Sequence, residues 1–237
     1  TDRSVGARLS GEIAARHGNT GFGGQLDLTF EGAAGQSFGA FLLQGMNVRL
    51  VGEANDYVGK GINGGRITVV PPAGGHDPGS KVILGNTCLY GATGGELFAL
   101  GRAGERFGVR NSGCRTVVEG AGDHCCEYMT GGVVVVLGST GRNVAAGMTG
   151  GVAFLLDEAG DLERRVNQET VAVVPLTTPE QEALLKPLLV AHHEATGSSK
   201  AAQLLADWPT CKAHIKLLVP PSEKVAMGLA ERQAVAA

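Results

Sequence analysis

The sequence predicts an all-β fold, a right-handed parallel β-helix built from single-stranded coils of about 19 residues. Three observations lead to this prediction. Glycine is the outlying residue, with 38 in 237 positions; the glycines recur at a fixed spacing; and apolar and polar positions alternate between them. Because a Gly-rich chain with 5% aromatic residues also fits low complexity, the spacing of the glycines decides the matter.

Six glycines mark the repeat, with successive steps of 19, 30, 19, 18 and 19 residues. The long step contains a run of turn-forming residues, 71–80, which we interpret as a loop inserted into one coil. One strand and one turn per repeat leave no room for a crossover helix, so βαβ units are excluded. Stacked coils spaced by about 4.8 Å satisfy the pattern, and parallel β connections are generally right-handed. The six glycines are Gly45, Gly64, Gly94, Gly113, Gly131 and Gly150.

Aligned on these glycines, the repeats give columns of consistent chemistry. The positions three and five residues after each glycine are apolar with one exception, as expected of the inward face of a strand. The first of these columns contains Val48, Ile67, Leu97, Thr116, Val134 and Ala153, and the second contains Leu50, Val69, Ala99, Val118, Val136 and Leu155. A polar column lies just before the glycines and suits hydrogen bonding along the stack: Asn63, Thr93, Ser112, Thr130 and Thr149.

The segments before the repeats differ in character. Residues 1–18 predict a short helix with Ser4 as its N-cap and Gly18 as its stop. Residues 20–43 resemble further, less regular coils, so we assign the β-helix to residues 19–175. The whole chain, 1–237, is interpreted as a single domain.

The segments after the repeats predict a helical C-terminal extension over residues 176–237. A strand is expected at 170–174, and a helix from 178 to 195 that Pro187 should kink or split. A second helix is expected at 199–208, followed by a short apolar stretch and a frayed tail.

Composition excludes several classes of function. A net charge of −3 gives no basic footprint for nucleic acid or for an anionic membrane. No apolar run approaches the roughly 20 residues that span a bilayer. Five cysteines without framework spacing favour a reducing cytoplasm. The chain begins at Thr1 without a Met or a signal sequence, so we expect a piece of a longer polypeptide.

Residues 59–64 form a literal GxGxxG, which invites a dinucleotide-binding interpretation. That fingerprint requires a helix immediately after the glycines, because the helix N-terminus binds the pyrophosphate. Here residues 66–70 form a strand that ends in two prolines. We therefore interpret these glycines as turn residues of one coil and predict no cofactor-binding residue.

Cysteines recur in one column of the repeat. Cys88 and Cys125 lie six residues before their glycines, in a column with Phe107 and Val144 that we interpret as an interior stack. Two coils, about 10 Å, separate these sulfurs, too far for a disulfide or one shared zinc ion. If the chain is extended there, Cys125 and Cys126 point to opposite sides, which makes them poor co-ligands.

The histidines and the acidic residue near this column could have structural roles or form a catalytic or metal site. Asp123 and His124 are interpreted as a buried hydrogen-bonded pair, and structural roles are favoured over a catalytic or metal site. The histidines of the tail, His192, His193 and His214, are interpreted as surface or packing residues. We predict no catalytic and no metal-binding residue.

One outward stripe, four and six residues after the repeat glycines, is apolar and should not face water. It is either covered by the terminal helices or docked against another domain, and we hypothesise docking for at least part of it. This candidate docking stripe consists of Phe98, Leu100, Val117, Val135, Leu137, Phe154 and Leu156.

The chain resembles the C-terminal GXGXG domain of the glutamate synthase large (alpha) subunit. The resemblance covers essentially the whole chain, although at Cys125 the family pattern has glycine, and the 71–80 loop looks like a variable insertion. The runs that match are 35–41, 53–61, 85–95, 117–120, 122–124 and 127–132.

This resemblance implies a multidomain enzyme. An amidotransferase domain with an N-terminal cysteine releases ammonia from glutamine, and a tunnel leads the ammonia to an FMN-bearing synthase domain with a 3Fe-4S cluster. There 2-oxoglutarate is converted to glutamate through an imine. The chain lacks the N-terminal cysteine, a cluster-binding run and a flavin motif, so we expect no FMN or 3Fe-4S on it and no activity of its own. Its implied role is to hold the amidotransferase and synthase domains of the same polypeptide, with a small subunit in the holoenzyme.

Two alternatives remain open at this point. One is a stand-alone β-helix subunit of a related redox complex, such as the formylmethanofuran dehydrogenase subunit that the fold resembles. The other is a polysaccharide-active β-helix enzyme, which needs a groove with paired carboxylates and aromatic side chains. The outward columns show no such carboxylate pair, and three Tyr and one Trp are few for sugar stacking. The mass of the native polypeptide separates the first alternative from a domain of a large subunit.

Overall fold

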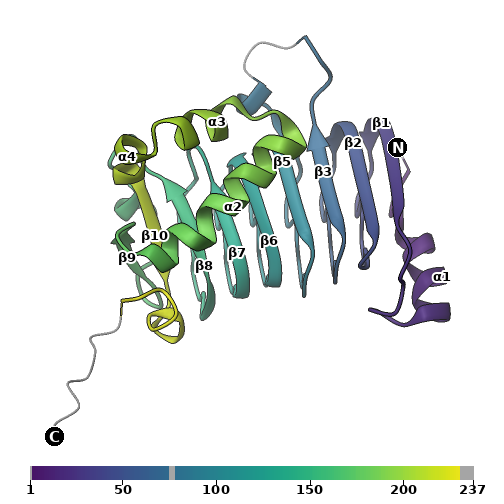
Figure 1. The fold of residues 1–237 in the computed structure, drawn as a ribbon, viewed down its shortest axis with the longest axis horizontal. Coiled ribbons are helices and arrows are strands. Elements are labelled where there is room, and N and C mark those ends of the chain that lie inside the picture. Colours follow the sequence, from purple (N-terminus) through teal and green to yellow (C-terminus); the bar gives the residue numbers. More distant parts are fainter. Residues whose placement is uncertain (1, 75–77, 230–237) are drawn as a thin grey trace, which may run out of the picture.

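The computed structural model describes residues 2–74 and 78–229 of the chain. Its strands stack in one row as a parallel β-solenoid of about seven turns, with helices near both ends (Figure 1). The parallel β-helix predicted from the repeat is confirmed. The strands are β1 (Leu26–Ala34), β2 (Met46–Ala54), β3 (Arg66–Val70), β4 (Val82–Leu84), β5 (Glu96–Ala103), β6 (Ser112–Gly120), β7 (Thr130–Val136), β8 (Gly150–Leu156), β9 (Ala172–Pro175) and β10 (Ile215–Val219).

The register of the solenoid keeps each predicted column in line. Val48 pairs with Ile67, Ile67 with Leu97, and the same column continues to Ala153 in β8. Its one polar member, Thr116, is buried and donates its hydroxyl hydrogen to the Leu97 carbonyl at 2.7 Å. The inward columns form one continuous apolar core, because every coil contributes the same positions to it.

The N-terminal helix α1 (Ala7–His17) covers the first coil near its lower end in Figure 1. The predicted N-cap is wrong. Gly6 precedes the helix with φ 93°, while the Ser4 N–H donates to the Gln36 carbonyl at 2.8 Å and ties the N-terminus to the first coil. Gly18 ends the helix as predicted. The following segment is more regular than expected, since β1 pairs with β2 along nine residues without a slip.

The inserted loop lies at the edge of the stack. It ends in a 3₁₀ turn (Pro78–Ser80) and is followed by β4, which pairs beside β2 and β5. Arg66 still pairs directly with Glu96 across the insertion, so the loop leaves the repeat in register. The predicted insertion is confirmed by this pairing.

The C-terminal segment is only partly helical, contrary to the prediction. Helix α2 (Pro179–Thr196) begins with a capping box between Thr178 and Gln181, and Pro187 does not split it. Buried leucines on both sides of Pro187 hold the helix against the sheet and offset its missing N–H. The predicted second helix is broken at Asp207 into α3 (Ser199–Ala206) and α4 (Trp208–Cys211).

The apolar stretch after α4 is strand β10, which the sequence interpretation did not assign. It pairs antiparallel with both β8 and β9, so it covers the open edge of the last coil. An exposed edge strand invites aggregation, and this strand removes that edge at one end of the stack. Further 3₁₀ turns lie at Leu162–Arg164, Lys212–His214 and Pro221–Glu223. The tail expected to fray lies mostly at 230–237, outside the described residues.

Candidate functional site

The candidate docking stripe is covered by the chain itself. Six of its seven side chains are buried in a second core between the strands and the C-terminal segment. Helix α2 crosses the outward face of the strands in Figure 1 and contributes Leu185, Leu188 and Leu189, while β10 contributes Leu217. The hypothesis that the stripe docks against another domain is therefore wrong for these six; Leu100 is half-buried. They are Phe98, Val117, Val135, Leu137, Phe154 and Leu156.

A buried polar cluster joins this C-terminal segment to β6. The Glu119 Oε1 atom accepts hydrogen bonds from Ser198 Oγ at 2.6 Å and pairs with His192 Nε2 at 2.8 Å. The sequence interpretation treated His192 as a surface or packing residue and gave it no polar partner. The signal that could have placed it in the interior is its helical spacing from Leu185 and Leu188, at positions i+7 and i+4 of the buried face.

The cluster does not have the arrangement of a catalytic triad. A serine nucleophile needs its hydroxyl on the imidazole, and the carboxylate on the other ring nitrogen. Here Ser198 and His192 both bind the same oxygen of Glu119, and His192 Nδ1 has no partner. Ser198 also accepts from the Ala201 N–H as the N-cap of α3. These contacts fasten α2 and α3 to the solenoid.

The cysteine column is interior, as predicted. Cys88, Phe107, Cys125 and Val144 are all fully buried in the main core. Burial raises the pKa of the Cys88 thiol to about 12, so the thiol is neutral and a poor nucleophile or metal ligand at physiological pH.

Cys125 and Cys126 do not point to opposite sides, because the chain is not extended there. Cys126 has φ 61°, and the two sulfurs lie 3.7 Å apart, both buried. The hydrogen bond shared with Cys125, together with burial, raises the pKa of Cys126. Within residues 2–74 and 78–229, no group of three or more His, Cys, Asp or Glu side chains is placed to bind a metal ion.

The expected buried pair of Asp123 and His124 is also wrong. Asp123 binds Arg142 instead, through the Arg142 N–H at 2.9 Å and the guanidinium Nε at 3.0 Å. The Arg142 backbone N–H holds the pKa of Asp123 below its usual value. His124 Nδ1 lies 3.1 Å from Asn143 Nδ2, and its side chain is partly exposed.

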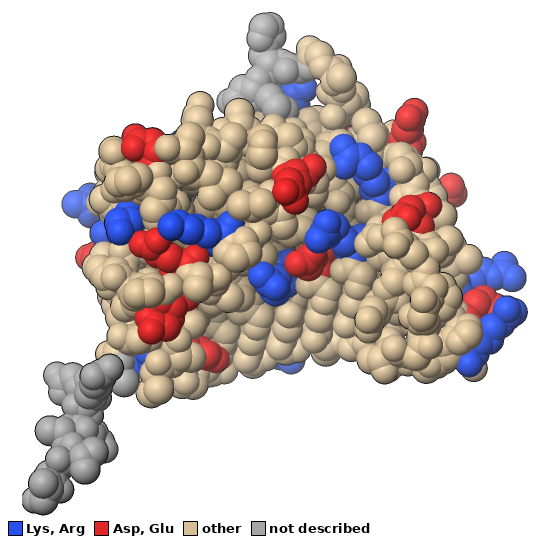
Figure 2. Space-filling view, in the orientation of Figure 1, with Lys and Arg blue, Asp and Glu red and all other residues tan. Residues whose placement is uncertain are grey.

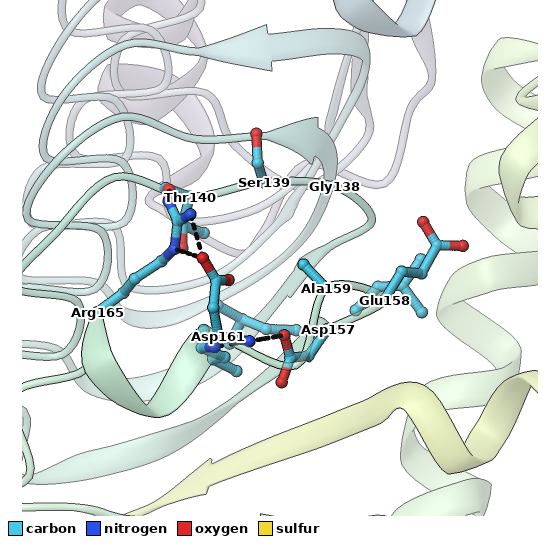
Figure 3. A pocket seen from close by; sticks show the side chains of 11 residues that line it. Gly138, Ser139, Thr140, Asp157, Glu158, Ala159, Asp161 and Arg165 are labelled. Atoms are coloured by element: carbon cyan, nitrogen blue, oxygen red, sulfur yellow. Dashed lines mark hydrogen bonds and ion pairs between the residues drawn. The ribbon is translucent and has the colours of Figure 1, made fainter.

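Figure 3 shows a pocket of about 170 Å³ where the chain leaves β8. Arg165 Nε donates to Asp161 Oδ2 at 3.0 Å, and Arg165 Nη1 donates to the Thr140 carbonyl at 2.6 Å. Asp157 Oδ1 accepts from the Asp161 N–H at 3.1 Å. The bond from Arg165 lowers the pKa of Asp161. These charges are used to close the last turn, and the pocket is smaller than ordinary ligand pockets of about 300–1,000 Å³.

The turns between the strands form a second wall of the solenoid, which we call the turn wall. The inward side chains of turns and strands meet in the same core, so the turn wall lies across the core from the strands. α2 packs on the outer face of the strands and is therefore remote from it. The turn wall comprises residues 35–44, 55–64, 85–94, 104–112, 122–130 and 141–149.

Each turn repeats one backbone pattern. Three alternate residues have φ between 52° and 74°, in the left-handed region, and the residues between them do not. Glycine occupies only six of these 18 positions. The triplets are Ser37, Gly39, Phe41; Tyr57, Gly59, Gly61; Thr87, Leu89, Gly91; Arg106, Gly108, Arg110; His124, Cys126, Tyr128; and Asn143, Ala145, Gly147.

This pattern explains the literal GxGxxG at 59–64. Gly59 and Gly61 are two left-handed positions, and a Cβ on Gly64 would lie 2.6 Å from the backbone nitrogen of Gln44 in the adjacent coil. The strand expected to follow is β3. Turn geometry and close coil packing therefore account for all three glycines.

On the face that α2 covers, acidic and basic side chains of the described residues are mixed, and neither sign of charge forms a large patch (Figure 2). No helix in the described part of the chain is long and apolar enough to cross a membrane.

Together these features define a class: a parallel β-solenoid domain whose turns repeat alternate left-handed positions. The model of the family described as the GXGXG motif matches residues 1–221, and the chain belongs to this family. The name GXGXG describes glycines at every second position, and the left-handed positions in each turn have the same spacing.

The chain is similar to one region of much longer proteins. It is 60% identical over 225 residues to ferredoxin-dependent glutamate synthase 2 of Synechocystis sp., covering 94% of this chain and 14% of that protein. It is 59% identical over 224 residues to the chloroplastic ferredoxin-dependent glutamate synthase of Spinacia oleracea, with the same coverage. For the ferredoxin-dependent glutamate synthase of Antithamnion sp., identity is 55% over 226 residues, or 95% of this chain and 15% of the relative. The chain thus spans about 14% of the length of the curated relatives that it matches, in their C-terminal region.

Proposed function

We propose that this chain is a non-catalytic structural domain of a glutamate synthase, which forms L-glutamate from L-glutamine and 2-oxoglutarate. Its role is to scaffold the amidotransferase and FMN synthase domains of the same polypeptide. The names and coverage of the relatives support the parent enzyme. The relatives are named as ferredoxin-dependent, which extends the proposal to ferredoxin as the electron donor.

One observation supports the scaffold role above the others: the continuous register from β1 to β8. Six successive strand pairings keep the same columns in line, and β10 pairs with the last strand of this row. A stack of this kind keeps a constant rise per coil of about 4.8 Å. It therefore fixes the distance between anything attached to its two ends.

The residues present do not fit an iron–sulfur cluster, which requires converging thiolates. Four of the five thiols are buried in the core, and burial raises the pKa of Cys88 and Cys114. The proposal therefore assigns FMN and the 3Fe-4S cluster to the other domains. A small subunit as partner and a cytoplasmic location remain predictions from the resemblance and from the unpaired cysteines.

The test has two parts. The native polypeptide should be several times heavier than this 24.2 kDa chain. The purified chain should neither release ammonia from glutamine nor form glutamate. In the full polypeptide, deletion of residues 1–221 should uncouple the reactions, so that glutamine hydrolysis no longer matches glutamate formation. A native mass of about 24 kDa, or turnover by the purified chain, would contradict the proposal.

A further inference from the structure

The turn wall presents aromatic side chains to solvent. Phe41 is 53% exposed, Tyr57 36%, Tyr90 37% and Tyr128 53%. The sequence contains three tyrosines, and all three lie on this wall. Large apolar groups gathered on one exposed face are typical of an interaction surface.

Three of these aromatic residues occupy left-handed backbone positions. Phe41 has φ 59°, Tyr57 62° and Tyr128 53°; the column of Phe41 and Tyr128 holds glycine in three other coils, at Gly61, Gly91 and Gly147. Left-handed backbone is unfavourable for a residue with a Cβ, and more so for a bulky one. An exposed ring gains little from burial in return. Strain of this kind is concentrated at functional sites.

Basic side chains accompany the rings. Lys60 Nζ lies 5.6 Å from the centre of the Tyr57 ring, and the Arg110 guanidinium lies 5.9 Å from that of Tyr128. The turn wall has four basic and four acidic side chains in its sequence, so it has no net charge to attract nucleic acid or an anionic membrane. Aromatic residues with arginine on a neutral surface are the composition of protein–protein interfaces.

We propose that the turn wall is the surface on which another domain of the same polypeptide docks. The inference rests on the proposed function and specifies the docking face. The match covers 14% of the Synechocystis and spinach relatives, so about 86% of their length lies outside it and could supply the docking domain. Helix α2 covers the outward face of β3, β5 and β6, α1 packs beside the first turn, and β10 pairs with the edge of β8. The turn wall is thus the long face to which every coil contributes and which the described chain leaves exposed.

A purely structural role for the rings makes a different prediction. A Cβ on Gly61 would lie 2.7 Å from the Phe41 ring, and one on Gly147 would lie 2.5 Å from the Tyr128 ring. The rings therefore lie over glycine backbone of the next coil. If they served only to cover that backbone, their removal would destabilise the isolated chain.

Hydroxyl-radical footprinting with mass spectrometry tests the docking face directly. The rates of oxidation of Phe41, Tyr57, Tyr90 and Tyr128 are compared between the purified 237-residue chain and the full polypeptide. We expect at least fivefold protection of these residues in the full polypeptide. Val190 on α2, which is 40% exposed, is the internal control and should react alike in both. Equal rates for the four aromatic residues would overturn the inference.

A second variant separates docking from structure. Tyr128→Gly removes the ring and relieves the left-handed strain, so the melting temperature of the isolated chain should rise or stay unchanged. In the full polypeptide, the same variant should increase the rate of limited proteolysis between domains at least fivefold. A lower melting temperature with unchanged proteolysis would overturn the inference. A native mass of about 24 kDa would instead reject the proposed function, and the named partner with it.

Discussion

Substitution of Phe98 by alanine tests whether α2 truly covers the strands. Phe98 is fully buried, its ring centre lies 6.0 Å from that of His192 on α2, and the Arg66 guanidinium lies 5.4 Å from the ring on the same outward face. Removing a buried phenylalanine ring typically lowers the free energy of unfolding by about 3–5 kcal/mol, because transfer free energy is lost and a cavity remains. We expect a loss within that range for the purified chain.

The assay is urea unfolding followed by far-UV circular dichroism. Phe41→Ala is the matched control, because it makes the same chemical change at a residue that is 53% exposed. It should change the free energy of unfolding by no more than about 0.5 kcal/mol. If Phe98→Ala cost less than about 1 kcal/mol, the stripe would be open in the isolated chain, and our account of the second core would be wrong.

Three further predictions follow from contacts of the C-terminal segment and the core. Glu119→Ala should lower the free energy of unfolding by about 2–3 kcal/mol, since it leaves a buried imidazole and a buried hydroxyl without their acceptor; urea unfolding measures this, and a loss below about 0.5 kcal/mol would contradict it. A hydrogen bond from Lys186 lowers the pKa of Glu182 to about 2 from an ordinary 4.5, so its contribution is present above pH 4.5 and is lost as pH falls toward 2. The stability difference between the wild type and Glu182→Gln should therefore shrink over that range, and a constant difference would argue against it. At pH 8 only Cys211 should react with a thiol reagent in the folded chain, and all five cysteines after unfolding; rapid reaction of Cys88 would refute this.

The repeat was the most predictable part of the fold, for a physical reason. A solenoid places chemically equivalent residues at a fixed interval, so the inward columns could be found by counting, and the one polar member, Thr116, did not obscure them. The insertion at 71–80 could also be recognised, because the period resumes after it.

The contacts made by the C-terminal segment were less predictable. Whether an apolar outward column is covered by the same chain or by another depends on how α2 folds back, and periodicity contains no such long-range information. The same limit explains β10, whose five residues, four of them apolar, become a strand only because β8 and β9 offer unpaired edges. His192 was missed because its partner Glu119 is 73 residues away in sequence.

The prediction for the cysteine pair was wrong for a local reason. The prediction for Cys125 and Cys126 assumed an extended backbone, in which neighbouring side chains alternate. The repeat places Cys126 at a left-handed position, which turns both sulfurs into the core. The repeats themselves held the clue, since the column of Cys126 holds Gly39, Gly59 and Gly108 in other coils and glycine is common where φ is positive.

The loop that leaves the stack between β3 and β5 has a consequence for how such a domain changes over evolution. Because Arg66 pairs with Glu96 as though the intervening residues were absent, the chain can lengthen or shorten at this point without altering the height of the stack. Insertions at an exposed loop tip are well tolerated in general. A fluorescent or affinity tag placed there should leave both ends of the domain where they are.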